Sequence, residues 1–206
     1  MSASPQEKWI SREEYSASER TSPVKHEYYN GQIYAMAGGS PAHARLGFNI
    51  SVAIGKRLQG KSCRGASSDQ RVRIEASGLE TYPDALVVCP PERYAEDDAN
   101  VLLNPALIVE VLSPSTEAYD RGGKFGQYSQ IDALRDYILV SQDRIGVEHF
   151  QRAAGGEWRF RRCTRREDAL PLENLEITIP LEEIYEGLDV PSGLLMLHNA
   201  PDMLGS

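Results

Sequence analysis

Cysteine and long apolar runs are scarce in this sequence. Of 206 residues only Cys63, Cys89 and Cys163 are cysteine, and they form no Cys-x-x-Cys pair. An odd, scattered set of this kind predicts neither a zinc knuckle nor a disulfide framework and is typical of the reducing cytoplasm. No run approaches the roughly 20 apolar residues of a membrane span, and the first residues lack the layout of a signal peptide. We therefore expect a cytoplasmic protein without a membrane partner.

Basic residues are missing from the last forty positions. Residues 167–206 contain nine acids and no lysine or arginine, which leaves 21 of the 30 acids against all 22 bases in residues 1–166. The formal net charge of -8 therefore belongs to the C-terminal fifth. A basic cluster stands just before it and comprises Arg159, Arg161, Arg162, Arg165 and Arg166. Two interpretations stay open for this cluster, a contact for a polyanion or the solvated face of a strand.

Turn and cap patterns organise the N-terminal part of the chain. Residues 11–14, Ser-Arg-Glu-Glu, have the spacing of a capping box and predict a short helix to about residue 19. Asn30-Gly31 predicts a type I′ hairpin turn, which places Glu27 opposite Tyr34. A second helix is expected from residue 40 to residue 60, because Ser-Pro begins it, apolar residues recur every four positions and Gly ends it.

The remaining pattern predicts an α+β fold with a mixed sheet and a helix packed on each side. Alternation in residues 70–75 predicts a half-exposed strand. Further strands are expected near 61–66, 82–89, 106–112, 136–140, 145–151, 158–163 and 175–179, with a loop over 90–103, a helix over 117–131 and a helical turn over 181–185.

Two short apolar runs bounded by proline each contain one carboxylate. Asp84 stands near the start of the first run, residues 82–89, and Glu110 stands deep in the second, residues 106–112. Such runs are typical of strands that are buried on both faces. An ionised carboxylate there is costly unless a cation or hydrogen-bond donors compensate it. A shared divalent metal ion and a cationic side chain both remain open as the compensating group.

The third predicted helix brings a lysine toward these acids. Asp120, Lys124 and Tyr128 are spaced four residues apart and share one helix face. If the two strands are neighbours, Asp84 and Glu110 converge at one end of the sheet. Oxygen ligands of this kind favour Mg²⁺ or Mn²⁺, which acidifies water and neutralises phosphodiester charge. A nearby lysine stabilises developing negative charge, so the residue types suit phosphodiester hydrolysis.

A longer set of residues forms one recognisable pattern: Glu27 with Asn30-Gly31, His43, Tyr82-Pro83-Asp84, residues 110–116 (Glu-Val-Leu-Ser-Pro-Ser-Thr), and Asp120 through Lys124 to Tyr128. Over roughly residues 10–185 this pattern resembles the Uma2 family (DUF820), a bacterial branch of the PD-(D/E)xK nuclease superfamily. The resemblance implies a restriction-endonuclease-like mixed β-sheet core flanked by helices, with an N-terminal β-hairpin. We expect an N-terminal segment with a short helix at 1–22, the endonuclease-like domain at 23–186 and an acidic C-terminal tail at 187–206.

The resemblance also implies roles for individual residues. Asp84 matches the Asp of the Pro-Asp motif and Glu110 the acid of the (D/E)xK motif, and both are metal ligands in the family's superfamily. The lysine of that motif falls at position 112, where this chain has Leu112. Lys124 is the expected replacement, because a long side chain from a flanking helix reaches the same place.

Four further residues are candidates for supporting roles. Glu27 or His43 adds a metal ligand, or else Glu27 is an acid on a hairpin face and His43 caps or packs in the first turn of its helix. Asp120 or Tyr128 orients Lys124, unless Lys124 only forms a surface pair with Asp120.

The expected function is that of a Mg²⁺- or Mn²⁺-dependent deoxyribonuclease, with Asp84, Glu110 and Lys124 as its catalytic residues. One alternative is a nucleic-acid-binding or assembly protein that lost turnover, which Leu112 and the acidic tail favour. A hydrolase that acts on RNA or nucleotides is another. Because nucleases of this superfamily commonly dimerise, a homodimer through the apolar segment 194–197 is a further hypothesis.

Overall fold

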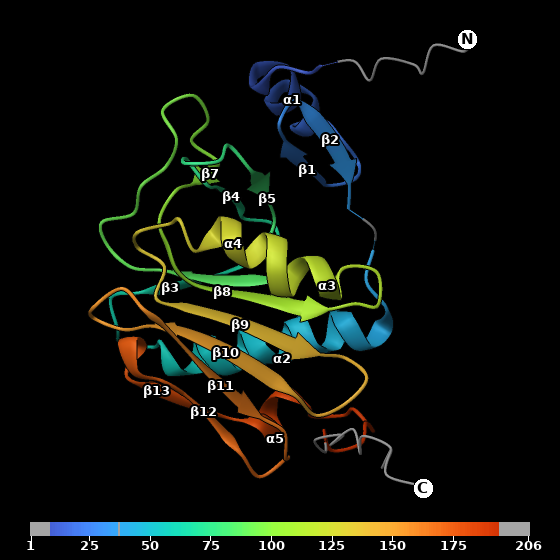
Figure 1. The fold of residues 1–206 in the computed structure, drawn as a ribbon, viewed down its shortest axis with the longest axis vertical. Coiled ribbons are helices and arrows are strands. Elements are labelled where there is room, and N and C mark those ends of the chain that lie inside the picture. Colours follow the sequence, from blue (N-terminus) through green and yellow to red (C-terminus); the bar gives the residue numbers. More distant parts are fainter. Residues whose placement is uncertain (1–8, 37, 194–206) are drawn as a thin grey trace, which may run out of the picture.

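A six-stranded mixed sheet lies at the centre of the structure, a computed structural model that describes residues 9–36 and 38–193 (Figure 1). Strands β8 and β9 run parallel, and the other neighbouring strands run antiparallel. The spatial order is β11 (Trp158–Cys163), β10 (Val147–Arg152), β9 (Asp136–Ser141), β8 (Pro105–Leu112), β6 (Ala85–Val88) and β3 (Arg64–Ser67). The predicted mixed sheet is confirmed.

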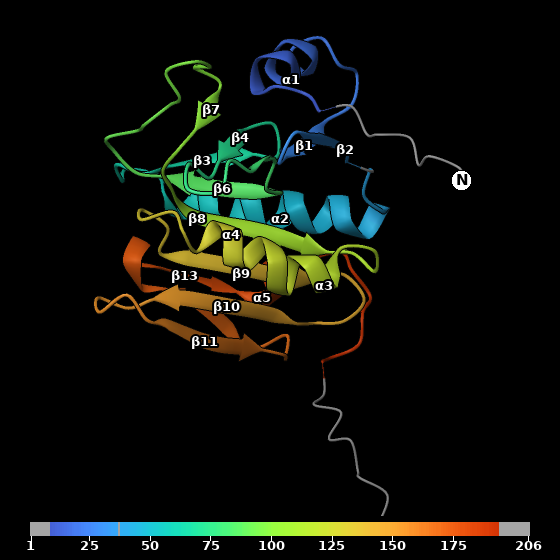
Figure 2. The ribbon, with the colours of Figure 1, turned by 45° about the horizontal axis from the view of Figure 1, so that its top comes forward.

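Helical segments cover both faces of this sheet, as Figure 2 shows. Helix α2 (Pro41–Arg57) packs Leu46 and Ile50 against one face. The other face carries a segment of three parts, α3 (Glu117–Tyr119), the π-helical turn η1 (Asp120–Lys124) and α4 (Phe125–Tyr128). Because strand residues alternate between faces, each side of the sheet has its own apolar core.

A second, five-stranded sheet carries the N-terminal hairpin. Its order is β2 (Gln32–Ala35), β1 (His26–Tyr29), β5 (Glu80–Thr81), β4 (Arg71–Arg73) and β7 (Val101–Leu102). Asn30 and Gly31 have φ angles of 49° and 75°, and Glu27 lies opposite Tyr34, so the predicted turn and register are confirmed. Helix α1 (Arg12–Glu19) begins with the predicted capping box at Ser11 and packs on this sheet.

The last part of the described chain packs beside α2. Strands β12 (Ala169–Leu172) and β13 (Ile177–Pro180) form a two-stranded sheet around the 3₁₀ turn η2 (Glu173–Leu175), and α5 (Leu181–Ile184) follows. Glu183 of α5 forms a two-pronged ion pair with Arg57 of α2, at 2.6 and 2.8 Å. Strand β12 was not predicted, because Leu-Pro-Leu is too short a pattern to read as a strand.

The prediction of one continuous α-helix over 117–131 is wrong in two respects, the regularity of the helix and the residue at which it ends. The helix ends at Tyr128 and contains the π-helical turn 120–124 in place of continuous α-helix. Gly122 and Gly123 lie inside this turn, and glycine weakens an α-helix because it leaves the backbone least restrained. π-helical turns occur mostly as single turns and frequently at functional sites.

The strand predicted over 70–75 is present as β4 (Arg71–Arg73), but the expectation that it is half exposed is wrong. Both Arg71 and Arg73 of β4 are buried, because acids from other parts of the chain cover them. Arg71 lies 2.5 Å from Asp98, and Arg73 lies 2.7 Å from the fully buried Glu80. The alternation of arginine and apolar residues resembles a solvent-facing strand because the pattern does not reveal these distant partners.

The expectation of three reduced cysteines is corrected by a disulfide between Cys63 and Cys89. Strands β3 and β6 pair antiparallel with Arg64 opposite Val88, so the next pair in this register is Cys63 and Cys89. The two positions are 26 residues apart and belong to no recognisable motif. Cys163 is free and buried.

Three other expectations concern the surface and the chain ends. In the basic cluster, Arg162 pairs with Glu148 and Arg165 with Asp168, whereas Arg159 and Arg161 are exposed on β11. Within residues 9–36 and 38–193, no helix is long and apolar enough to cross a membrane. The apolar segment 194–197 and most of the proposed acidic tail lie outside the described residues.

We predict that Gly31→Ala lowers the melting temperature more than Gly60→Ala. Both glycines have a positive φ, 75° and 78°, so alanine costs about 1 kcal/mol of backbone strain at either position. A Cβ atom at Gly31 would also stand 2.2 Å from the ring of Trp9, whereas no atom in the described part of the chain lies within 4 Å of one at Gly60. Thermal unfolding followed by circular dichroism measures both variants. Equal melting temperatures would refute the packing of Trp9 on the hairpin turn.

Candidate active site

The two predicted acids lie at the same end of the central sheet. Ala85 of β6 pairs with Val109 of β8, so the next positions in this antiparallel register are Asp84 and Glu110. Residues directly opposite one another in such a pair direct their side chains to the same face. Glu110 is buried and Asp84, just before β6, is partly exposed. The predicted convergence of these two carboxylates therefore follows from the observed pairing.

Lys124 reaches Glu110 from the helical segment above the sheet. Its Nζ lies 2.9 Å from Glu110 Oε1, and only 6% of the lysine is exposed. Tyr128 Oη donates a hydrogen bond of 2.9 Å to the same carboxylate oxygen. The alternative that Lys124 forms only a surface pair with Asp120 is wrong, since the lysine is buried and its distance to Asp120 Oδ1 is 3.8 Å.

Burial controls the ionisation of this pair. Burial raises the pKa of Glu110 to about 8, although the positive charge of Lys124 acts in the opposite direction. For Lys124 burial acts to lower the pKa, but the negative charges of Glu110, Glu27 and Asp120 outweigh it and the pKa is raised. Lys124 therefore remains an ammonium group at neutral pH.

Asp84 is held by the first turn of α2 and by the neighbouring strand. His43 Nε2 lies 2.9 Å from Asp84 Oδ1, and the backbone N–H of Val111 donates a hydrogen bond of 2.7 Å to Oδ2. The hydrogen bond to Asp84 raises the pKa of His43. His43 is placed here because Ser40 caps α2 by accepting from the His43 backbone N–H. His43 therefore does more than pack within its own helix turn.

Glu27 reaches the same cleft from the hairpin. Its carboxylate accepts hydrogen bonds from Thr81 Oγ1 at 2.8 Å and from Tyr119 Oη at 3.0 Å. Tyr119 was not singled out from the sequence. It reaches Glu27 because its ring lies over Gly123, where an added Cβ would stand 2.8 Å from the ring. Tyr119 and Gly123 are four residues apart and lie on one side of the helical segment, and the missing side chain of the glycine leaves room for the ring.

These residues line one cleft of about 730 Å³. All of the predicted site residues except the buried Tyr128 contribute to its lining, and the list is Glu27, His43, Asp84, Glu110, Asp120 and Lys124. Leu112, which occupies the motif position of the lysine, is instead buried in the apolar core on that side of the sheet. The cleft therefore combines two central carboxylates, two further acids, one buried ammonium group and a histidine.

The donor set fits a hard divalent cation with few protein ligands. Across residues 9–36 and 38–193, no three His, Cys, Asp or Glu side chains converge into a preformed metal cage. Magnesium sites commonly use only one or two carboxylates and keep several waters. Asp84 and Glu110 supply two such carboxylates on adjacent strands, and Lys124 engages Oε1 of Glu110. A two-carboxylate site is compatible with this arrangement.

An ion-pair network fixes the helical segment to the sheet beside the cleft. Arg121 of the π-helical turn pairs with Glu148 of β10 at 3.0 Å and also with Glu117. Arg162 of β11 pairs with the other Glu148 oxygen at 2.6 Å. These two arginines lower the pKa of Glu148 even though burial acts to raise it. The sequence did not indicate this network, because its members come from three separate segments.

A model of the Uma2 family, described as "Putative restriction endonuclease", matches residues 12–182. Among curated proteins, the chain is 37% identical to the uncharacterized protein slr1290 of Synechocystis over 87% of this chain and 93% of that protein. It is 33% identical to a second uncharacterized Synechocystis protein, sll1609, over 73% of this chain and 85% of that protein. The family resemblance inferred from the motifs is confirmed.

A solved structure supports the fold. The crystal structure of a "putative nuclease belonging to DUF820" from Anabaena variabilis superposes with a TM-score of 0.65 at 15% sequence identity. The match covers 79% of this chain and 90% of that one. At this low identity the likeness concerns the fold alone, and it confirms the predicted restriction-endonuclease-like architecture.

We predict that Glu148→Gln destabilises the protein by about 1 kcal/mol at pH 7. The substitution replaces a buried carboxylate by a neutral amide, so the ion pairs with Arg121 and Arg162 are lost. The folded pKa of Glu148 lies below the ordinary 4.5, so its contribution is complete above pH 4.5 and is lost as the pH falls through the lower folded value. The melting-temperature gap between wild type and variant should therefore close in acid.

The control for this prediction is Glu167→Gln. Glu167 is 70% exposed and lies 3.6 Å from Arg165, so its loss should change stability little at any pH. Melting curves recorded between pH 3 and pH 7 provide the comparison. If the difference in melting temperature between wild type and Glu148→Gln stays constant with pH, the assigned ion-pair network is contradicted.

Proposed function

The chain belongs to the Uma2 family, and on this premise we propose that it is a divalent-metal-dependent nuclease that hydrolyses phosphodiester bonds in DNA. The observation that supports this proposal most is the position of Lys124. Its ammonium nitrogen lies 2.9 Å from Glu110 although position 112 of the motif is leucine. The chain thus retains the three chemical groups of a PD-(D/E)xK site, with the lysine supplied by a helix.

Asp84 and Glu110 are the residues proposed to hold the cation, Mg²⁺ or Mn²⁺. When bound there, the ion would neutralise charge on the phosphodiester and make a water more acidic. The Val111 N–H and His43 fix the carboxylate of Asp84 in one orientation. Tyr128 does the same for Glu110, so the two ligands are preorganised before substrate arrives.

Lys124 supplies a fixed positive charge beside the proposed scissile phosphate. An ammonium group in a site with little water stabilises developing negative charge more strongly than it would in solvent. The same group is able to orient a water by donating a hydrogen bond to it. Asp120 and Glu27 surround Lys124 with negative charge and keep it protonated, which is a positioning and electrostatic role.

One alternative function has a specific observation in its favour. Leu112 fills apolar core space where the motif has lysine, and Lys124 is engaged with Glu110. A chain that binds nucleic acid or assembles with partners, without turnover, is compatible with both facts. Catalysis and binding must therefore be measured separately.

We predict that the purified protein cleaves plasmid or single-stranded DNA in the presence of Mn²⁺ or Mg²⁺. Asp84→Asn, Glu110→Gln and Lys124→Met should each reduce the rate by on the order of 100-fold or more, since each removes a group that acts on the transition state. Glu75→Gln is the matched control, because Glu75 is an exposed acid paired with Arg93. Gel assays of initial rates, repeated with RNA, measure the loss. Equal rates for wild type and Lys124→Met would refute its catalytic role.

We also predict that Mn²⁺ raises the melting temperature without any nucleic acid. At a concentration of about 100 times Kd, binding stabilises the folded state by about 2.7 kcal/mol, or roughly 5–10 °C for a chain of this size. Asp84→Asn and Glu110→Gln should abolish the increase, whereas Glu75→Gln should retain it. An increase that survives both substitutions would place the ion elsewhere.

A further inference from the structure

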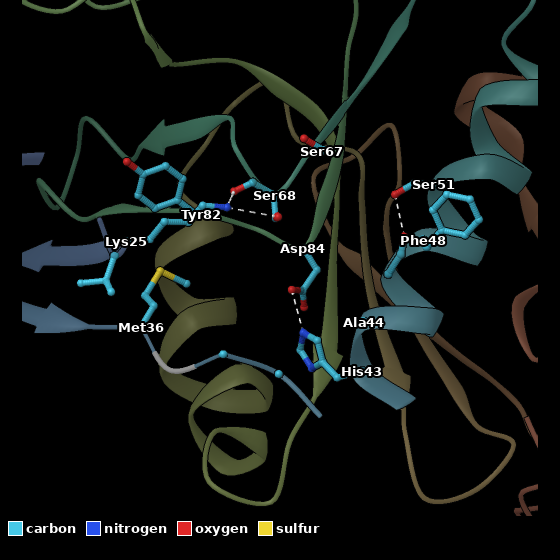
Figure 3. A pocket seen from close by; sticks show the side chains of 14 residues that line it. Lys25, Met36, His43, Ala44, Phe48, Ser51, Ser67, Ser68, Tyr82 and Asp84 are labelled. Atoms are coloured by element: carbon cyan, nitrogen blue, oxygen red, sulfur yellow. Dashed lines mark hydrogen bonds and ion pairs between the residues drawn. The ribbon is translucent and has the colours of Figure 1, made fainter. Parts of the chain in front are cut away.

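A second cavity of about 590 Å³ lies on the α2 side of Asp84. Figure 3 shows Tyr82, Lys25 and Met36 on one side of it and α2 on the other, with the hydrogen bond between Asp84 and His43 between them. Asp84 and His43 line this cavity and the catalytic cleft alike. The two spaces therefore meet at a proposed metal ligand.

Small residues of α2 form one wall of the cavity. Ala44, Gly47 and Ser51 follow one another along the helix, and all three line the space. At Gly47 no heavy atom of the residues that the structure describes lies within 4 Å of the place that a Cβ would occupy. A glycine inside a helix costs stability relative to alanine, and packing does not require this one. Its effect is to keep the cavity open.

Aromatic and polar groups complete the cavity. Tyr82 is held in place because its hydroxyl donates to Glu19 at 3.0 Å and Lys25 Nζ lies 5.5 Å from its ring centre. Phe48, at the α2 rim, is 69% exposed, which is unusual for a large apolar side chain. Ser67 and Ser68 line the side formed by β3 and the turn after it, and the Ser68 hydroxyl accepts a hydrogen bond of 3.3 Å from Lys25 Nζ.

We propose that this cavity receives one unpaired nucleobase of the substrate strand, next to the phosphate that lies at Asp84. This inference rests on the proposed nuclease function and adds the class of substrate to it. The volume lies within the range of about 300–1,000 Å³ that small-molecule sites occupy. Aromatic rings offer stacking surfaces that accept any base, and serine hydroxyls can donate to or accept from a base edge.

The cavity distinguishes an unpaired strand from a continuous duplex. A base inside a duplex is stacked and paired, so it enters a concave site only after it leaves the helix. A base in a single strand, flap or bubble meets no such barrier. The preferred substrate is therefore single-stranded or locally unpaired DNA.

The experiment compares two leucine substitutions on α2 in a Glu110→Gln background, which removes turnover and leaves the second cavity's lining intact. Gly47→Leu fills the cavity. Gly55→Leu is the matched control, because Gly55 is also a helical glycine with open space at its Cβ and lines neither this cavity nor the cleft. The probe is a single-stranded oligonucleotide of about 12 nucleotides that contains 2-aminopurine, with its duplex for comparison. Fluorescence quenching reports stacking, and anisotropy reports affinity.

We expect Gly47→Leu to weaken single-strand binding about tenfold and to remove the quenching, as loss of one stacked base would do. Gly55→Leu should stay within about twofold of its parent, and neither should lower the melting temperature. If Gly47→Leu fails to fold, Phe48→Ala tests the same cavity, because its exposed side chain leaves the core intact. We then expect a smaller loss in the same direction.

Cleavage rates in the native background separate this inference from the proposed function. If the protein cleaves DNA and Gly47→Leu matches Gly55→Leu in affinity, quenching and rate, the base-binding cavity is refuted while the nuclease proposal stands. If binding depends on Gly47 but no variant cleaves any nucleic acid, the cavity stands as a nucleic-acid site and the nuclease proposal is refuted. Tighter binding of duplex than of single strand would overturn the inferred substrate class.

Discussion

In the pair of Lys124 and Glu110 an ammonium nitrogen lies 2.9 Å from a carboxylate oxygen, and each residue is only 5–6% exposed. Removing such charges from water is costly, and loss of one partner leaves the other uncompensated, at about 3–5 kcal/mol. The arrangement persists because Tyr128 donates a further hydrogen bond to Glu110. This pair therefore fixes the distance between the helical segment and strand β8.

The rest of the cleft is arranged around that connection. Once the helical segment is fixed above β8, Tyr119 stands over Gly123 and reaches Glu27 on the hairpin. Arg121 joins the same segment to Glu148 on β10. The cleft thus has walls from both large sheets and from the helices on both faces of the central sheet. The proposed cation site and the proposed base site share Asp84, so a DNA strand bound across this residue would contact both sites.

Local patterns predicted the parts of this structure that depend on neighbouring residues. The hairpin at Asn30-Gly31 and the caps at Ser11 and Ser40 require only their own turns, and they are confirmed. Apolar runs bounded by proline also predicted two buried strands that contain Asp84 and Glu110, and the convergence expected for neighbouring strands follows from their observed pairing. Such features are set by backbone geometry and by alternation.

Features that depend on distant partners were not predictable. The alternation in β4 did not reveal that Asp98 and Glu80 would bury its arginines. Cys63 meets Cys89 only because β3 and β6 happen to pair in that register. The contact of Lys124 with Glu110 was inferred from family resemblance and four-residue spacing, whereas the turn that delivers it was expected to be regular α-helix.

The π-helical turn also gives this segment tolerance to a change in chain length. A π turn holds one residue more than an α turn, so deletion of a single residue between Asp120 and Lys124 would allow continuous α-helix to form. The wider turn already takes up the rotation of about 100° that one extra residue adds to an α-helix, so the residues on either side of the deletion would keep their directions. Tyr119 would then still face the side of the segment that Tyr128 faces. Such a deletion would remove a bulge of the backbone and spare the alignment of its two ends.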